Sequence, residues 1–340
     1  MTIENLEKEL NNKNLGSLYL LYGEELFLLE SNLKKIKALF GECIKGINYI
    51  LVDEQNVSEI ISDIETPSFG YEKKLIIVRN TGLLKKEGKK KTGEISKLKD
   101  KLVQYIDENI KIINESVILV FVEEEADNKS ELYKTIEKNG IVCKFDYQKP
   151  LQIEQRIKAI CNGYKVQIES QTIRYFIECC GTNMQDLINE IRKLIEYAGE
   201  NGIIKKEDID KLSIKKLESV IFDLTDDLGK KDISGALQVL NNLIYAKEPL
   251  VKILVTLYNH FKKIYITKIA LNTNKDLASS LNLKPNQTFL TTKYKMQAKY
   301  FKENELRHIL QELCDLDYNF KNGKIDLQVG IETILCRYCS

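Results

Sequence analysis

The residues best placed to do chemistry follow the first strongly apolar segment, Ser17–Tyr22. In nucleotide-binding α/β proteins this position carries G-x-x-x-x-G-K-[ST], whose backbone N–H groups hold phosphates and whose hydroxyl group holds Mg²⁺. Here the segment runs into Gly23-Glu24-Glu25 instead. Because two carboxylates stand where a triphosphate needs positive charge, the sequence predicts no working nucleotide site after this segment.

Other segments resemble parts of a nucleotide site without completing one. Two glycine pairs approximate the phosphate-loop spacing, but neither is followed by lysine and a hydroxyl residue: Gly41 with Gly46, and Gly82 with Gly88. The apolar segment Val117–Val122 ends in Glu123-Glu124-Glu125, a pattern that can position Mg²⁺ and water. Without a phosphate loop, we interpret these acids as a solvated strand end.

The eight cysteines and two histidines form no recognisable metal or catalytic set. Only Cys336 and Cys339 form a C-x-x-C, whereas a four-ligand zinc site needs two such pairs or a nearby pair of histidines. The remaining members are isolated, or adjacent within an apolar stretch: Cys43, Cys143, Cys161, Cys179, Cys180, Cys314, His260 and His308. We predict reduced thiols, no metal, no cofactor and no catalytic activity from this chain alone.

The composition limits the partners and the location of the chain. Its 340 residues are enough for two or three domains, and 43% apolar residues are enough for sizeable cores. A net charge of +1 provides no global field for nucleic acid, so any such contact must be local. The polar N-terminus and the lack of a long apolar run predict a cytoplasmic protein without a membrane partner.

Up to residue 148 the chain alternates between apolar runs and amphipathic stretches, such as Leu26–Phe40. The predicted strands are Ser17–Tyr22, Ile47–Asp53, Lys74–Arg79, Val117–Val122 and Val142–Tyr147. Near-continuous apolar strands separated by helices indicate a mostly parallel sheet covered on both faces. We therefore expect an α/β domain over residues 1–148.

From residue 149 the strand signals almost vanish, and the fold class becomes all-α. We expect a small helical domain over residues 149–212 and a larger one over 213–340. In the first, Leu187, Ile191, Leu194 and Ala198 share one helical face, and Glu190 can pair with Lys193. In the second, Glu248-Pro249 predicts a helix start, and Asn274 is the predicted cap of a short helix.

The stretch Ile64–Asn80 contains an unusual aromatic residue. Phe69 lies between Pro67 and Gly70, just before an apolar strand, and both neighbours favour a sharp turn. A phenyl ring on such a tip either packs back onto its own sheet or is offered to a partner. The residues alone leave both alternatives open.

Two lysine-rich segments are candidates for contact with phosphates. Residues 85–94, KKEGKKKTGE, predict a solvated loop or a phosphate-contacting arm. In residues 293–302, Lys295, Lys299 and Lys302 would share one helical stripe, opposite Tyr294, Ala298 and Phe301. This pattern is typical of a solvated basic helix face, and the alternative is a salt-sensitive DNA contact.

The order of several motifs resembles the delta subunits of the bacterial DNA polymerase III clamp loader. The matching segments, in order, are Leu18–Glu25, Thr66–Asn80, Val117–Glu124, Gly181–Leu194, Ile221–Leu240 and Leu313–Ile331. The resemblance spans almost the whole chain. It implies an AAA+-like P-loop-type domain without a functional Walker A motif, a small helical lid domain and a C-terminal helical collar.

The resemblance also implies a function by binding. Delta subunits bind the ring-shaped sliding clamp and help to open it for loading onto primed DNA, while sister subunits, joined through the collar, hydrolyse ATP. The clamp contact would fall on Ser68 and Phe69, flanked by Pro67, Gly70 and Tyr71. The first position of this pair is often leucine, so Phe69 would supply most of the contact energy, helped by Ile64 or Tyr71.

Two alternatives remain at this stage. One is a divergent AAA+ ATPase motor, against which the missing phosphate loop argues. The other is a stand-alone DNA-binding protein that uses the two lysine-rich segments, against which the near-neutral net charge argues.

Overall fold

The computed structural model describes residues 1–86 and 93–339, which form two compact units, Met1–Tyr147 and Gln148–Ser340. The α/β architecture followed by helices agrees with the predicted fold class. Most of the lysine-rich loop predicted over residues 85–94 lies outside the described residues. Within the described ranges, no helix is both long and apolar enough to cross a bilayer.

The first unit is built on a five-stranded parallel sheet of order β2-β3-β4-β1-β5. Its strands are β1 (Leu18–Tyr22), β2 (Tyr49–Val52), β3 (Lys74–Arg79), β4 (Val117–Glu123) and β5 (Ile141–Lys144). All five predicted strands are confirmed, with bounds that shift by a few residues. The three central strands, β3, β4 and β1, are buried almost throughout, as expected for a sheet covered on both faces.

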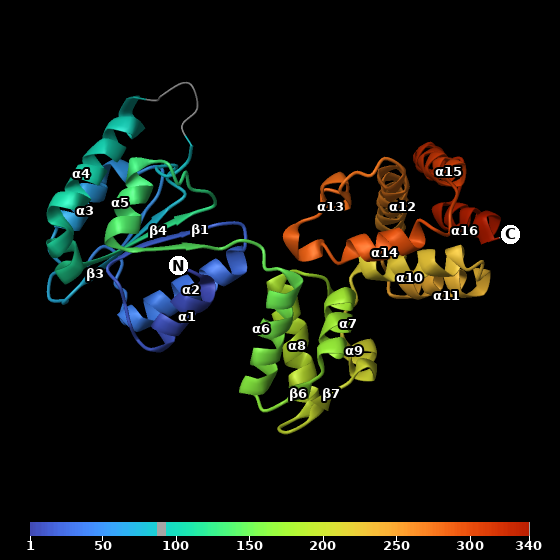
Figure 1. The fold of residues 1–340 in the computed structure, drawn as a ribbon, viewed down its shortest axis with the longest axis horizontal. Coiled ribbons are helices and arrows are strands. Elements are labelled where there is room, and N and C mark those ends of the chain that lie inside the picture. The colour runs from blue at the N-terminus through green and yellow to red at the C-terminus, as the bar shows by residue number, and fades with distance from the viewer. Residues whose placement is uncertain (87–92, 340) are drawn as a thin grey trace. The chain divides into compact units, whose positions relative to one another are not determined.

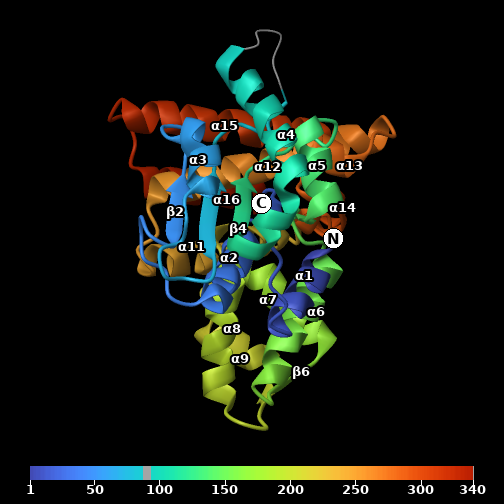
Figure 2. The same cartoon turned by 90° about the vertical axis from the view of Figure 1, so that its left-hand side faces the viewer.

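Helices cover both faces of this sheet (Figure 1). On one face lie α1 (Ile3–Asn11) and α2 (Leu26–Phe40), the latter with the predicted bounds. The other face carries η1 (Val57–Glu59), α3 (Ile60–Glu65), α4 (Gly93–Ser116) and α5 (Glu131–Asn139). Figure 2 shows the unit from the side of α3 and α4.

The second unit begins with four helices and a small sheet. These are α6 (Pro150–Gly163), β6 (Gln167–Ile168), α7 (Ser170–Cys180), α8 (Met184–Ala198), β7 (Ile203–Ile204) and α9 (Lys206–Leu212). The predicted pair on α8 is confirmed, with 2.7 Å between Lys193 Nζ and a Glu190 carboxylate oxygen. The parallel pair β6–β7 was not predicted, because two-residue strands are too short to show an alternating pattern.

The remaining helices of this unit follow, and most of them contribute buried residues to one large apolar core. They are α10 (Leu217–Gly229), α11 (Ile233–Tyr245), α12 (Leu250–Asn272), α13 (Leu277–Ser280), η2 (Pro285–Gln287), α14 (Leu290–Gln297), α15 (Glu303–Lys321) and α16 (Leu327–Cys339). The helix start at Glu248-Pro249 is confirmed, since Pro249 is the N-cap of α12. The predicted cap of α13 is wrong: Asp276, not Asn274, accepts the Ser279 N–H at 2.8 Å.

Candidate functional site

The tip, which we define as Pro67–Tyr71, connects α3 to β3. Pro67 disfavours helical geometry in the residue before it, and Thr66 is accordingly extended, with φ −64° and ψ 131°. The backbone N–H and the hydroxyl of Thr66 both donate to the Ser62 carbonyl, at 2.9 and 2.7 Å. Helix α3 therefore ends in a defined geometry directly before the tip.

A tight turn over Ser68–Tyr71 forms the tip itself. The Tyr71 N–H donates to the Ser68 carbonyl at 3.2 Å, and the Ser68 hydroxyl donates to the Tyr71 carbonyl at 2.5 Å. Both central residues have positive φ, 33° at Phe69 and 89° at Gly70, as in a type I′ turn. Glycine adopts such a φ freely, but for phenylalanine it is strained, and strain of this kind collects at functional sites.

The Phe69 side chain is exposed. Its relative accessibility is 72%, so the ring is not packed on its own sheet. Tyr71 beside it is half-buried. Ile64, expected as a helper in the contact, is only 4% exposed and belongs to the core under α3. That expectation is therefore wrong, because Ile64 lies on the inward face of α3.

The connection at the opposite edge of the sheet, between β1 and α2, is short and closed. Only Gly23, Glu24 and Glu25 separate the two elements. The Gly23 N–H donates to the Glu123 carbonyl at 3.3 Å, and the Glu25 N–H donates to the Phe145 carbonyl at 2.9 Å. The φ of Gly23 is 135°, and a Cβ there would lie 2.3 Å from the Phe145 oxygen. The backbone is packed against its neighbours where a phosphate loop would need open N–H groups.

Glu123 is buried at this same edge, so the predicted solvated strand end is wrong at its first acid. Strand β4 extends through Glu123, which pairs with Tyr22 and is only 1% exposed. One carboxylate oxygen accepts the N–H and the hydroxyl of Thr81, each at 3.0 Å. Burial raises the pKa of Glu123, while the bonds from Thr81 oppose this shift. Glu124 and Glu125 are exposed, as predicted.

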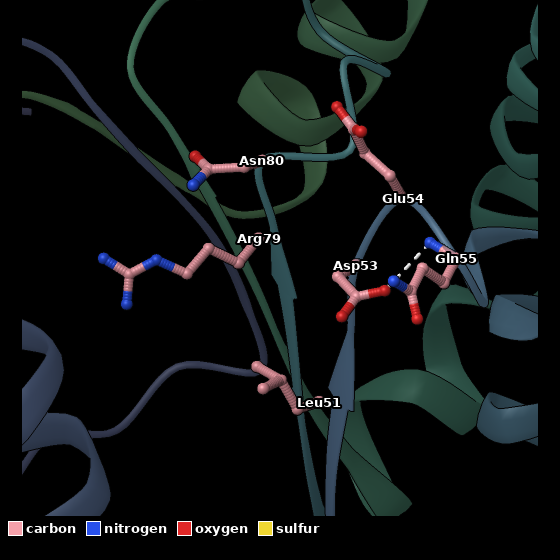
Figure 3. Close-up of a pocket in the computed structure, with 6 residues that line it drawn as sticks. All are labelled: Leu51, Asp53, Glu54, Gln55, Arg79 and Asn80. Atoms are coloured by element: carbon pink, nitrogen blue, oxygen red, sulfur yellow. Dashed lines mark hydrogen bonds between the residues drawn. The ribbon is translucent and has the colours of Figure 1, made fainter.

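A hollow of about 490 Å³ lies where β2 and β3 end (Figure 3). Its lining residues are Leu51, Asp53, Glu54, Gln55, Arg79 and Asn80. Arg79 forms an ion pair with Glu30 of α2, and the Gln55 N–H donates to Asp53 at 2.9 Å. None of the predicted contact residues lies here. With two carboxylates and an arginine already paired, the hollow offers an anionic ligand little attraction.

The three lysines predicted as a DNA contact do not share a helical stripe. Helix α14 ends at Gln297, so Lys295 lies on α14, Lys299 lies in the following turn, and Lys302 is the N-cap of α15. All three side chains are exposed. The predicted apolar stripe is confirmed in its burial, because Tyr294, Ala298 and Phe301 are each at most 3% exposed.

One of the two histidines and four of the described cysteines are buried in the cores. His260 is buried on α12, where its Nε2 contacts Gln297 Oε1 at 2.7 Å and burial lowers its pKa to about 3. Cys143, Cys161 and Cys180 are buried, and burial raises the pKa of each thiol. Among residues 1–86 and 93–339, no group of three acidic, histidine or cysteine side chains is arranged to hold a metal ion.

Two family models match this chain. The model described as "DNA polymerase III, delta subunit" matches residues 19–146, and "DNA polymerase III delta subunit, C-terminal domain" matches residues 218–338. Together they cover most of the first unit and most of the helices from α10 to α16.

Similar proteins carry the same description. The chain is 27% identical to the DNA polymerase III subunit delta of Bacillus subtilis over 337 residues, which covers 96% of this chain and 94% of that protein. It is 28% identical to the probable DNA polymerase III subunit delta of Aquifex aeolicus, covering 88% and 85%.

The fold agrees with these matches. The solved structure of the Bacillus subtilis DNA clamp loader delta protein superposes with a TM-score of 0.77 at 24% identity, over 99% of both chains. The motifs quoted from the sequence, the two family models and the shared fold all point to the same family. The chain therefore belongs to the family of DNA polymerase III delta subunits.

Proposed function

We propose that this chain binds a sliding clamp with the Phe69 ring and helps to open that ring-shaped partner for loading onto primed DNA, without hydrolysing ATP itself. The observation that carries the proposal is the exposed phenyl ring on a strained turn. Neither the exposure nor the positive φ benefits the fold of the unit by itself, so a role in partner binding is the economical explanation.

The energetics fit a single anchor residue. Burying a phenylalanine side chain in a partner's pocket contributes about 1.5–3 kcal/mol, which is the size of a binding hot spot. In this proposal Pro67, Gly70 and Tyr71 shape the turn that presents the ring. Ser68 contributes mainly through its hydroxyl bond to Tyr71, because its side chain adds little apolar area.

The proposed lack of ATP hydrolysis is supported by the connection between β1 and α2. It holds three residues, two of them acidic, and Gly23 lies against the backbone of Phe145. Charge and space thus both disfavour a triphosphate there. Sister subunits would supply the hydrolysis that drives loading in the cytoplasm.

The division of the helical part is also a proposal. We assign residues 149–212 to a lid domain and residues 213–340 to a collar that joins sister subunits. In support, six helices of this part share a core of their own: α10, α11, α12, α14, α15 and α16. We further assign a contact with the phosphates of primed DNA to Lys295, Lys299 and Lys302, supported by their exposure.

The decisive experiment measures the affinity of the full chain for the organism's sliding clamp. We expect Phe69→Ala to weaken binding by tenfold or more, about 1.4 kcal/mol or more, with an unchanged Tm. Tyr245→Ala is the control, because Tyr245 is 91% exposed but lies on α11 in the second unit. An affinity of Phe69→Ala within twofold of the control would remove Phe69 from the mechanism.

A further inference from the structure

A charged residue is buried directly behind the tip. Lys74 is the first residue of β3, and its side chain is only 1% exposed. Lysine is almost never fully buried unless its ammonium group finds partners, because desolvating the charge is costly. Burial lowers the pKa of Lys74, while the nearby Asp63 carboxylate opposes this shift. The buried ammonium group of Lys74 therefore needs polar partners inside the unit.

The ammonium group binds the carboxyl end of α3. Lys74 Nζ donates to the Asp63 carbonyl at 2.7 Å and also to the Thr66 carbonyl. The last carbonyls of a helix lack intrahelical partners and form the negative end of its dipole, so a lysine there satisfies both the bonds and the charge. Helix α3 has only six residues, so the two carbonyls that accept from Lys74 belong to its last turn and its C-cap.

The same two bonds join the entry of the tip to its exit. Thr66 directly precedes Pro67, and Lys74 follows the tip by three residues. Proline has no N–H, and the hydrogen bonds described within the tip run between Ser68 and Tyr71. These internal bonds close the turn but do not anchor it to the sheet. The side chain of Lys74 connects the start of the tip to a buried strand.

The neighbouring lysine shows that this arrangement is specific to one position. Lys73 is half-buried, and its Nζ donates to the Asn114 carbonyl at 2.8 Å, near the end of α4. Two adjacent lysines thus bind the carboxyl ends of two different helices. Only Lys74 reaches the residues that lead into the tip.

We propose that Lys74 is a positioning residue that holds the tip in the geometry from which Phe69 reaches its partner. The inference rests on the proposed function of Phe69 for its consequence in clamp binding. The anchoring of the tip by Lys74 is a property of the free chain and is tested separately.

The first test is hydrogen exchange on the full chain without the clamp. We expect Lys74→Met to accelerate exchange of the Thr66 and Tyr71 amides by tenfold or more, because the tip loses its link to β3. Lys73→Met is the matched control and should leave these amides within twofold of the wild-type rates. Equal rates in the two variants would overturn the proposal. If Lys74→Met does not fold, Lys74→Gln replaces it under the same criterion.

The second test is a double-mutant cycle with the sliding clamp. We expect Lys74→Met to weaken binding about fivefold, and by less than twofold once Phe69→Ala is present, because Lys74 acts through the ring. Lys74→Arg, which keeps the charge and donors, should restore most of the affinity. An equal loss in both backgrounds would overturn the positioning role. Should Phe69→Ala alone have no effect, the proposed function fails, while the exchange rates still decide whether Lys74 anchors the tip.

Discussion

Two connections on opposite edges of one parallel sheet differ in what they leave accessible. Gly23, between β1 and α2, and Gly70, between α3 and β3, both have positive φ. Around Gly23 the backbone of Phe145 leaves no room for a side chain, whereas Gly70 has no atom within 4 Å of an added Cβ. A positive φ is thus found in a closed β1–α2 connection, at the edge where α/β proteins usually bind ligands, and in an open turn that exposes Phe69 at the other edge.

Under the proposed function, the two edges have different roles. The carboxyl edge holds a buried acid and a packed turn, while the amino edge holds the exposed ring. In this proposal the sheet and its helices serve as a rigid support for contact with a partner.

The largest effect is expected at the closed connection. Gly23→Ala combines an unfavourable φ with a 2.3 Å approach to the Phe145 oxygen, so we expect a loss of stability of roughly 3 kcal/mol or more. Gly70→Ala is the matched control, since it meets only the backbone strain and should cost about 1–2 kcal/mol. Thermal unfolding of both full-length variants measures the difference. Similar Tm values would contradict the claim that the two edges are packed differently.

A smaller effect is expected within the tip. Ser68→Ala removes the hydroxyl that donates to the Tyr71 carbonyl, which should weaken clamp binding about threefold, given roughly 0.5–1.5 kcal/mol for such a bond. Ser62→Ala is the control, because the hydroxyl of Ser62 on α3 makes a similar bond to the Glu59 carbonyl of η1, outside the tip. Titration of both variants with the clamp compares the two. A loss in Ser68→Ala no greater than in the control would mean that the turn needs no such bond.

The smallest expected effect is none at all. Titration of the isolated full chain with ATP and Mg²⁺ should give no saturable binding, because the β1–α2 connection offers carboxylates and packed backbone in place of a phosphate loop. Calorimetry measures this directly. Saturable binding at micromolar ATP would contradict the claim that the β1–α2 connection cannot hold a triphosphate, and it would favour the ATPase alternative.

Regular elements with a clear period were predictable from the sequence. Leu26–Phe40 was placed at the bounds of α2, and Lys74–Arg79 at the bounds of β3. These segments are either strongly amphipathic or continuously apolar, so local pattern and burial agree. The sharp turn around Phe69 was also predictable from the sequence, because proline and glycine around an aromatic residue carry a local backbone signal.

Elements that depend on distant partners were mispredicted. The helix expected across residues 293–302 stops at Gln297, whose amide donates to the Phe222 carbonyl and to Asp226 and whose Oε1 contacts His260. The period of the apolar residues continues through this break, so the sequence pattern does not reveal it. The cap of α13 was mispredicted for a different, local reason: the helix begins at Leu277, so Asp276 and not Asn274 stands at its N-cap.

By itself the sequence determined the α/β order, the lack of a phosphate loop and the turn that carries Phe69, since each depends on residues close together in the chain. Only the tertiary structure decided that the Phe69 ring is exposed, that Ile64 and Glu123 are buried, and that Lys74 binds the end of α3. The physical reason is that burial and long-range hydrogen bonds depend on which segments meet in space. A lysine at the start of a strand looks the same in the sequence whether its ammonium group faces water or the end of a helix.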